Sequence, residues 1–159
     1  MIIRLTQPPD IPNLFPLIEK ICDFHQSLDC DRYHFLPNQG ALYETWLNDL
    51  LLDSRNLCLV AEDEALPGSR LVGYTIATLE VEIPIYHLQE YGYIHDLWIE
   101  EPYRHQGIAR QMVMQTIDHF KQLGIQQIRL NTVVSNDAAL KLYTNCGFRP
   151  STIEMLIAL

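Results

Sequence analysis

The sequence lacks a long hydrophobic run and is poor in basic residues. No apolar stretch approaches the roughly 20 residues that cross a bilayer. The apolar start at residues 1–5 is interrupted by residues 6–9, too early for a secretory signal. We therefore expect a soluble, cytoplasmic protein with no membrane partner. Only 11 Lys and Arg stand against 20 Asp and Glu, giving a formal net charge of −9. This argues against sequence-independent nucleic-acid binding, which depends on cations that neutralise phosphates.

The cysteines form no Cys-x-x-Cys pair. The four are Cys22, Cys30, Cys58 and Cys146. In a cytosolic protein such cysteines are expected to be buried thiols. Four potential zinc ligands occur in one segment: Cys22, His25, Cys30 and His34. The first pair, Cys22 and His25, lies much closer to the second pair, Cys30 and His34, than the two pairs of known zinc fingers do. We predict no metal site.

The remaining composition is that of a globular protein. The 159 residues are 48% hydrophobic and 19% charged, which predicts a single domain over residues 1–159. The charge is uneven, because residues 1–101 hold 17 acidic residues against 5 basic ones, whereas residues 102–159 hold 3 against 6. This asymmetry favours a cationic ligand near the first part and an anionic ligand near the second, although a merely solvated acidic surface is an equal alternative.

The hydrophobic pattern predicts alternating helices and strands. We expect strands at 2–5, 57–61, 71–79, 91–99 and 128–134, with closing strands from Phe148 and from 153–158. Pro67-Gly68 marks a turn. We expect helices from between Asp10 and Pro16 to about His25, and at 41–52, 108–123 and 137–146, with Gly124 at the C′ position of the third. Pro12 or Pro16 is tolerated only in a first helical turn. This order indicates a mixed, mostly antiparallel α/β (α+β) sheet with helices on both faces.

The segment between the strand at 91–99 and the helix at 108–123 has the features of an anion site. Arg104-His105-Gln106-Gly107-Ile108-Ala109-Arg110 opens the helix. The free N–H groups of a first helical turn and the positive end of the helix dipole point at the same place. Gly107 and Ala109 leave room for a phosphate to approach the backbone, and the two arginines add positive charge. Most glycines before a helix are ordinary turns, so this pattern is weak by itself.

Two motifs in order give the pattern context. Residues 92–99 followed by Arg104-x-x-Gly107-x-Ala109 resemble motif A of the GCN5-related N-acetyltransferases (GNAT), and Asn136-x-x-Ala139-x-x-x-Tyr143-x-x-x-Gly147-Phe148 resembles their motif B. The resemblance covers nearly the whole chain. It implies a GNAT-like sheet of six to seven strands and about four helices. The strands at 91–99 and 128–134 would splay apart to admit the donor.

The resemblance also implies acetyl-CoA as the co-substrate. In that family the first strand pairs with the pantetheine arm, which implicates Leu97, Trp98 and Ile99. The pyrophosphate sits on the N–H groups from about Arg104 to Ala109, a set that comprises Arg104, His105, Gln106, Gly107, Ile108 and Ala109. Arg110 is a further candidate binding residue because of its charge. Asn136 would hydrogen-bond the pantetheine, or brace the opening, or cap the following helix, as Asn does well.

Transfer to an amine needs a base for the ammonium and an acid for the departing thiolate. The resemblance places a phenol near the thioester sulfur, which makes Tyr143 the candidate acid; otherwise it is a tyrosine packed on the sheet. His95 takes the position of a family base, and its ordinary pKa suits proton abstraction at neutral pH. Asp96, Glu90 and Glu82 are the alternatives. A simple strand alternation places Tyr93, His95, Leu97 and Ile99 on one side and Ile94, Asp96 and Trp98 on the other, unless a bulge near Leu97 intervenes.

The prediction is therefore an N-acetyltransferase (an acyltransferase) that moves an acetyl group from acetyl-CoA directly to a primary amine. The acidic first part favours a cationic small molecule or a protein or peptide amine, with Tyr33, Phe35, Tyr86 and Tyr91 as candidate lining residues. Cys146 is expected to be structural rather than an acyl carrier. The alternative is a catalytically inactive acyl-CoA-binding module. The resemblance is also compatible with a homodimer, since family members often pair through C-terminal elements.

Overall fold

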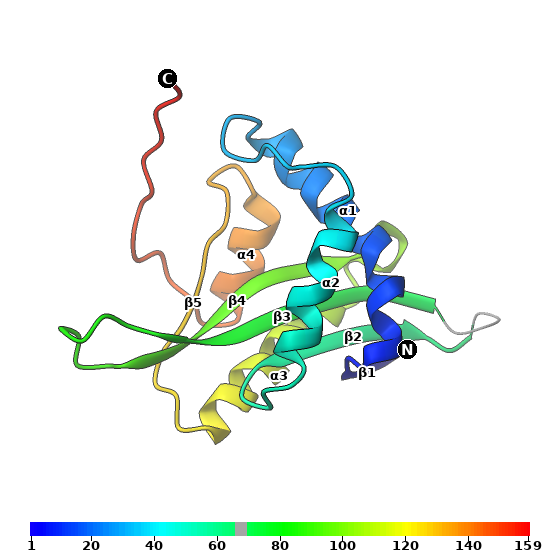
Figure 1. The fold of residues 1–159 in the computed structure, drawn as a ribbon, viewed down its shortest axis with the longest axis horizontal. Coiled ribbons are helices and arrows are strands. Elements are labelled where there is room, and N and C mark those ends of the chain that lie inside the picture. The colour runs from blue at the N-terminus through cyan, green and yellow to red at the C-terminus, as the bar shows by residue number, and fades with distance from the viewer. Residues whose placement is uncertain (66–69) are drawn as a thin grey trace.

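One five-stranded sheet forms the centre of the protein. The computed structural model describes residues 1–65 and 70–159, so the turn predicted at Pro67-Gly68 lies outside the described residues. The strands are β1 (Ile2–Leu5), β2 (Leu57–Asp63), β3 (Arg70–Val81), β4 (Glu90–Ile99) and β5 (Ile128–Leu130), in the spatial order β1-β2-β3-β4-β5. All neighbours are antiparallel except β4 and β5, which run parallel. The predicted mixed, mostly antiparallel sheet is confirmed (Figure 1).

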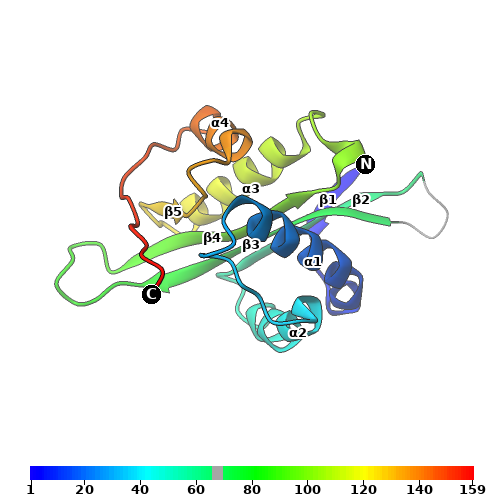
Figure 2. The same cartoon turned by 90° about the horizontal axis from the view of Figure 1, so that it is seen from above.

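Four helices cover the two faces of the sheet. Figure 2 shows α1 (Ile11–Leu28) and α2 (Gln39–Leu50) on one face, and α3 (Ile108–Gln122) and α4 (Asp137–Asn145) on the other. Short 3-10 turns precede α1 at Pro8–Asp10 and α3 at Glu101–Tyr103. Gly124, with φ 74°, follows the last residue of α3 and its C-cap, as the C′ prediction requires.

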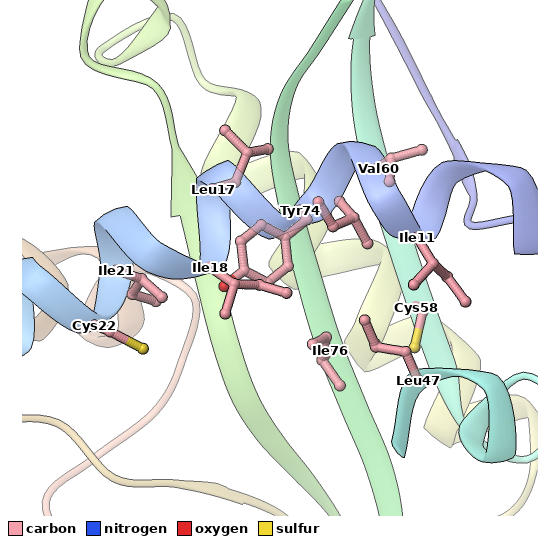
Figure 3. Close-up of a cluster of buried hydrophobic side chains, with 11 residues drawn as sticks. Ile11, Leu17, Ile18, Ile21, Cys22, Leu47, Cys58, Val60, Tyr74 and Ile76 are labelled. Carbon is pink, nitrogen blue, oxygen red and sulfur yellow. The ribbon is translucent and has the colours of Figure 1, made fainter. Parts of the chain in front are cut away.

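Each helical layer has its own hydrophobic core against the sheet. The core under α1 and α2 includes Ile18, Leu47 and Tyr74, all fully buried (Figure 3). The core under α3 includes Met112 and Phe120 against inward-facing residues of β2, β3 and β4. The regular helical spacing of apolar residues in α1 and α3 produces these buried stripes and made both helices predictable.

The helix α1 tolerates a proline where none was expected. It begins at Ile11, within the predicted range, so Pro12 lies in its first turn but Pro16 lies inside the helix. The restriction of Pro16 to a first turn was therefore wrong. Burial of Leu14, Leu17 and Ile18 around it holds the segment helical despite the missing backbone N–H.

A bulge in β4 shifts the strand's alternation. Ile94 pairs with Ala77 and Asp96 with Ile76, so His95 is the extra residue. Because of this bulge, His95 and Asp96 both face α1 and α2, and Leu97 moves to the core under α3. The predicted grouping of Leu97 and Ile99 with His95 was wrong, because the bulge lies two residues earlier than the position considered.

The strands β4 and β5 diverge after three paired positions. Gly92, Tyr93 and Ile94 pair with Ile128, Arg129 and Leu130 respectively, and β4 then continues alone on this side to Ile99. The predicted splay between these strands is present, although β5 ends at Leu130 rather than at residue 134. The bulge at His95 comes directly after the last paired position, so the opening and the bulge coincide.

The chain after α4 forms none of the predicted closing strands. Residues 149–159 have no helix or strand and are exposed, although their apolar sequence is typical of a strand (Figure 1). The described residues therefore contain five strands rather than six or seven. Residues 149–159 follow the pattern of a strand, but they lie without a neighbouring strand to pair with.

Candidate active site

The turn before α3 presents a continuous run of unpaired backbone amides. None of the six N–H groups from His105 to Arg110 donates to a backbone carbonyl in the described part of the chain, and the first bond of α3 runs from Gln111 to Gly107 at 3.0 Å. His105 has φ 62° and Gly107 has φ 82°. Left-handed residues alternating in a turn aim successive N–H groups into one concavity, which binds anions. A residue other than glycine with a positive φ is uncommon, and such residues cluster at active sites and ligand clamps.

The space beside Gly107 is open. A Cβ built on Gly107 would meet only the Gln111 side chain, at 3.9 Å. Arg110 is exposed in the first turn of α3, whereas Arg104 turns back to the sheet, where its Nε donates to the carbonyl of Ile99 at 2.8 Å and its guanidinium lies 4.7 Å from the Trp98 ring. Arg104 therefore braces the turn against the end of β4, and the amides are left to receive the anion.

The free edge of β4 continues from the amide run toward the opening. Leu97, Trp98 and Ile99 pair with β3 on one side and have no strand on the other. Asn136 lies across the opening as the N-cap of α4, where its Oδ1 accepts from the N–H of Ala139 at 3.1 Å. The capping alternative for Asn136 is therefore observed, and a cap that uses Oδ1 leaves the side-chain NH₂ as a donor group.

Tyr143 comes from the face opposite to His95. It lies half-buried in α4 against the core under α3, with its ring 5.6 Å from that of Phe148. Burial, and after it the negative charge of Asp96, raise the pKa of Tyr143 well above its usual range. The phenol therefore keeps its proton at neutral pH, and no side-chain hydrogen bond within the described residues engages its hydroxyl. It is a group able to donate a proton.

His95 is bound on the other face by partners that the sequence analysis did not name. Its Nε2 lies 2.7 Å from the hydroxyl of Thr78, which donates to Glu80 Oε1 at 2.5 Å. The Trp46 ring of α2 packs edge-on at 5.1 Å. Burial lowers the pKa of His95, and Glu80 opposes this shift. A side chain that is 29% exposed and neutral at pH 7 suits a proton acceptor.

Asp96 has a different environment from His95. It is buried between the sheet and the helices α1 and α2, where the Tyr74 hydroxyl donates to its Oδ2 at 3.3 Å and Tyr43 adds a second hydrogen bond. Burial raises its pKa to about 6. The remaining alternatives are paired with arginines: Glu82 bonds to Arg129, and Glu90 lies 3.6 Å from Arg55. His95 is the candidate that combines exposure with a free ring nitrogen.

Trp46 and Tyr93 contact the His95 ring, and Tyr33 belongs to a separate aromatic stack in the loop after α1. Tyr33 stacks on His25 at 5.0 Å and on Phe35 at 5.9 Å, and Tyr93 lies 4.8 Å from the His95 ring. Of the other lining candidates, Tyr91 is covered by the Arg129 guanidinium at 3.9 Å, and Tyr86 is exposed in the loop between β3 and β4. Trp46, Thr78 and Glu80 were missed because strand and helix periodicity give no sign of which neighbours a bulged residue meets.

The cysteines fit no metal site. Cys22 and Cys58 are buried, and burial raises their pKa to about 11 and about 12, whereas Cys30 is exposed in the turn after α1. The expectation that all four are buried was wrong for Cys30, and Cys146 is only partly buried. No group of three or more metal-binding side chains occurs in residues 1–65 and 70–159.

No helix in residues 1–65 and 70–159 is long and apolar enough to span a membrane.

Comparison with known proteins places the chain in one protein family. Residues 17–148 match the family model described as the acetyltransferase (GNAT) family. Among curated relatives, N-alpha-acetyltransferase 30 of Schizosaccharomyces pombe is 44% identical over 57 residues, which is 36% of this chain and 38% of that protein. The uncharacterised N-acetyltransferase YhbS of Escherichia coli is 29% identical over 148 residues, covering 93% of this chain and 73% of that one. The match thus spans less than half the length of the first of these relatives.

Solved structures share the fold. A mutant of the BH1408 protein from Bacillus halodurans superposes with a TM-score of 0.85 at 23% identity, covering 100% of this chain and 99% of that one. A predicted acetyltransferase of Clostridium acetobutylicum, solved with acetyl-CoA, has a TM-score of 0.76 at 17% identity over 99% and 95% of the two chains. These likenesses confirm the fold.

Proposed function

Because the chain belongs to the acetyltransferase (GNAT) family, we propose that it is an acetyl-CoA-dependent N-acetyltransferase that acts on a cationic primary amine. The observation that carries the proposal is the run of six unpaired amides from His105 to Arg110, placed beside the opening between β4 and β5. A diphosphate bound there leaves the unpaired edge at Leu97–Ile99 to hold the pantetheine arm. The family match and the N-acetyltransferase relatives support the same chemistry.

The two faces of the sheet supply the two proton-transfer groups. His95 takes a proton from the ammonium on the α1/α2 side, and the freed amine nitrogen attacks the thioester carbon. The carbon–nitrogen bond forms first and gives a tetrahedral intermediate. When the intermediate collapses, the carbon–sulfur bond breaks, the leaving sulfur takes the proton of Tyr143, and the second proton of the attacking nitrogen restores the Tyr143 phenol. Backbone N–H groups near Leu97–Ile99 are the oxyanion donors. Burial raises the pKa of Cys146, which argues against an acyl-cysteine step and for direct transfer.

A cationic acceptor suits the surroundings of His95. Glu80 and the rings of Trp46 and Tyr93 offer a carboxylate and π-systems to an ammonium group. Relatives named N-alpha-acetyltransferase act on protein amines, and one structural neighbour is an aminoglycoside 6′-N-acetyltransferase of Acinetobacter haemolyticus. We propose a small cationic amine or a peptide N-terminus as the acceptor class.

The exposed thiol of Cys30 is in keeping with a reducing, cytoplasmic location.

The test is an acetyl-CoA assay over a panel of amines, with release of the free thiol as the readout. We expect polyamines, aminoglycosides or peptide amines to react, and anionic amino acids not to. Turnover of only anionic or neutral amines would contradict the charge argument. Binding of acetyl-CoA with no turnover on any amine, unchanged in Tyr143→Phe, would favour the inactive acyl-CoA-binding module.

The exposed chain after α4 supports a homodimer. Ile153, Met155 and Ile157 are more than 80% exposed, and Glu154 forms an ion pair with Arg32 at 2.9 Å. An extended apolar segment without a neighbouring strand is suited to pairing with a second copy. We expect a dimer by light scattering and a monomer after deletion of residues 151–159. A full-length monomer at micromolar concentration would contradict this proposal.

A further inference from the structure

Thr78 links His95 to Glu80. All three side chains come from the sheet, Thr78 and Glu80 from β3 and His95 from the bulge of β4. Thr78 is 4% exposed, so its hydroxyl is out of reach of bulk water. It stands 2.7 Å from His95 Nε2 and 2.5 Å from Glu80 Oε1, and the histidine and the carboxylate are themselves 3.6 Å apart.

Counting protons fixes the direction of both hydrogen bonds. A hydroxyl has one proton to donate, and an ionised carboxylate can only accept. At 2.5 Å from Glu80 Oε1 the Thr78 proton must point at the carboxylate, since two lone pairs would otherwise face each other. The oxygen of Thr78 is then an acceptor toward His95, so Nε2 of His95 must carry a hydrogen.

We infer that Thr78 and Glu80 are positioning residues that hold neutral His95 as its Nε2–H tautomer and make Nδ1 the proton-accepting atom. Nδ1 has no hydrogen-bond partner among the residues that the structure describes. The tautomer follows from the hydrogen bonds alone. The role of Nδ1 as the base that takes the proton of the amine rests on the proposed function.

Glu80 also stabilises the charged ring once Nδ1 has taken a proton. His95 then carries a positive charge 3.6 Å from Glu80 Oε1, and this charge remains linked to it through Thr78. The other side chains packed on the imidazole are the rings of Trp46 from α2 and Tyr93 from β4. Neither is charged at neutral pH, because burial raises the pKa of Tyr93 further. Glu80 is thus the carboxylate that sets the balance between the two forms of His95.

Nitrogen-15 NMR of the imidazole in the full chain without ligand tests the tautomer directly. In wild type at pH 8 we expect Nε2 protonated and Nδ1 unprotonated. In Thr78→Val the bridge is lost, so the two tautomers should mix; Thr78→Ser restores a hydroxyl and should restore the single tautomer. Glu80→Gln keeps an acceptor oxygen, so it should retain the tautomer while lowering the pKa of His95 by about one unit.

Two results would overturn the inference: a wild-type His95 protonated at Nδ1, or a Thr78→Val variant with the same single tautomer. A circular dichroism spectrum equal to that of wild type confirms that each variant is folded. In the amine assay, Glu80→Gln should shift the acidic limb of kcat/KM about one unit lower, since His95 must be neutral to act. If no amine reacts, the proposed function fails while the NMR result still decides the tautomer.

Discussion

The two halves of β4 differ in how their edges are used. Residues 90–94 have β3 on one side and, from Gly92, β5 on the other, and a Cβ at Gly92 would approach the Phe120 ring of α3 to 2.6 Å. Residues 95–99 keep only β3, begin with a bulge and lead into the unpaired amides before α3. One strand thus builds the fold with its first half and offers backbone groups to a ligand with its second.

This difference predicts which substitutions should change stability and which should change binding or rate. In the first half, changes should alter stability, because residues 92–94 are paired with strands on both sides and Gly92 and Ile94 are buried. In the second half, and in the elements that face it, changes at exposed positions should alter binding or rate while the fold persists; the exception is Asp96, whose buried carboxyl should act on stability. The predictions below test this division.

The largest effect is expected for Tyr143→Phe. Removing the hydroxyl takes away the proton donor for the leaving thiolate, so kcat should fall on the order of 10³-fold while the KM for acetyl-CoA changes little. Steady-state kinetics with a reactive amine measure this. Tyr103→Phe, which removes a hydroxyl bonded to Asp63 at 2.9 Å in the turn before α3, is the matched control and should keep kcat. A Tyr143→Phe variant within tenfold of wild type would contradict the assignment.

Asp96 should make the protein less stable as the pH rises, which is the opposite of the effect of a carboxyl with a lowered pKa. Its pKa is raised to about 6 in the fold against 3.8 ordinarily, so the folded protein holds a proton that the unfolded chain has released. The free energy of unfolding should therefore fall as the pH rises from about 4 to about 6. Asp96→Asn cannot ionise and should be more stable than wild type at pH 7 by about 3 kcal/mol.

Urea unfolding at pH 4 and at pH 7 measures the difference in free energy of unfolding between wild type and Asp96→Asn. The difference between the two proteins isolates Asp96 from carboxyls such as Asp10, whose pKa the Arg4 guanidinium lowers. If the difference in free energy of unfolding between Asp96→Asn and wild type does not grow with pH, Asp96 is not a buried acid of raised pKa.

Gly107→Val should weaken acetyl-CoA binding. A β-branched residue at φ 82° costs about 1–3 kcal/mol in backbone strain, so the amide run should lose its shape and the Kd should rise about tenfold. Gly124→Val is a close control, because Gly124 has φ 74° at the other end of α3 with nothing within 4 Å. Calorimetry should show wild-type affinity for the control. Equal losses in both variants would mean that the effect is general destabilisation.

The smallest effect is expected for Gly92→Ala in the fully paired half of β4. The added methyl would press on the Phe120 ring, and partial tilting of that ring should limit the cost to about 1 kcal/mol of unfolding free energy. Urea unfolding measures this cost. The kcat of the folded variant should equal that of wild type, and a selective loss of activity would break the division between the two halves.

Much of the fold could be predicted from the sequence because its signals are local. The apolar stripe of α3, its C′ glycine and the alternation of β2 and β3 each depend on neighbouring residues. The closing strands were predicted wrongly for the same reason, since a strand-like sequence forms a strand only where a partner edge is available.

The candidate site was predictable in part. The turn at Gly107 precedes α3 and Asn136 caps α4, as the sequence indicated, whereas the catalytic role of Tyr143, which the resemblance implies, stays a prediction. The environment of His95 was not predictable, because a single extra residue in β4 sends His95 and Asp96 to one face. Thr78 and Glu80 meet His95 through strand pairing across 17 and 15 positions of the chain, which no local pattern encodes.

Backbone NMR during titration with acetyl-CoA tests the central claim most directly. The account predicts that the largest amide shifts occur at residues 105–110, followed by 97–99, while residues 90–94 in the fully paired half of β4 change little. Saturable binding with the residue 105–110 amides unmoved, or no binding at millimolar acetyl-CoA, would contradict the account.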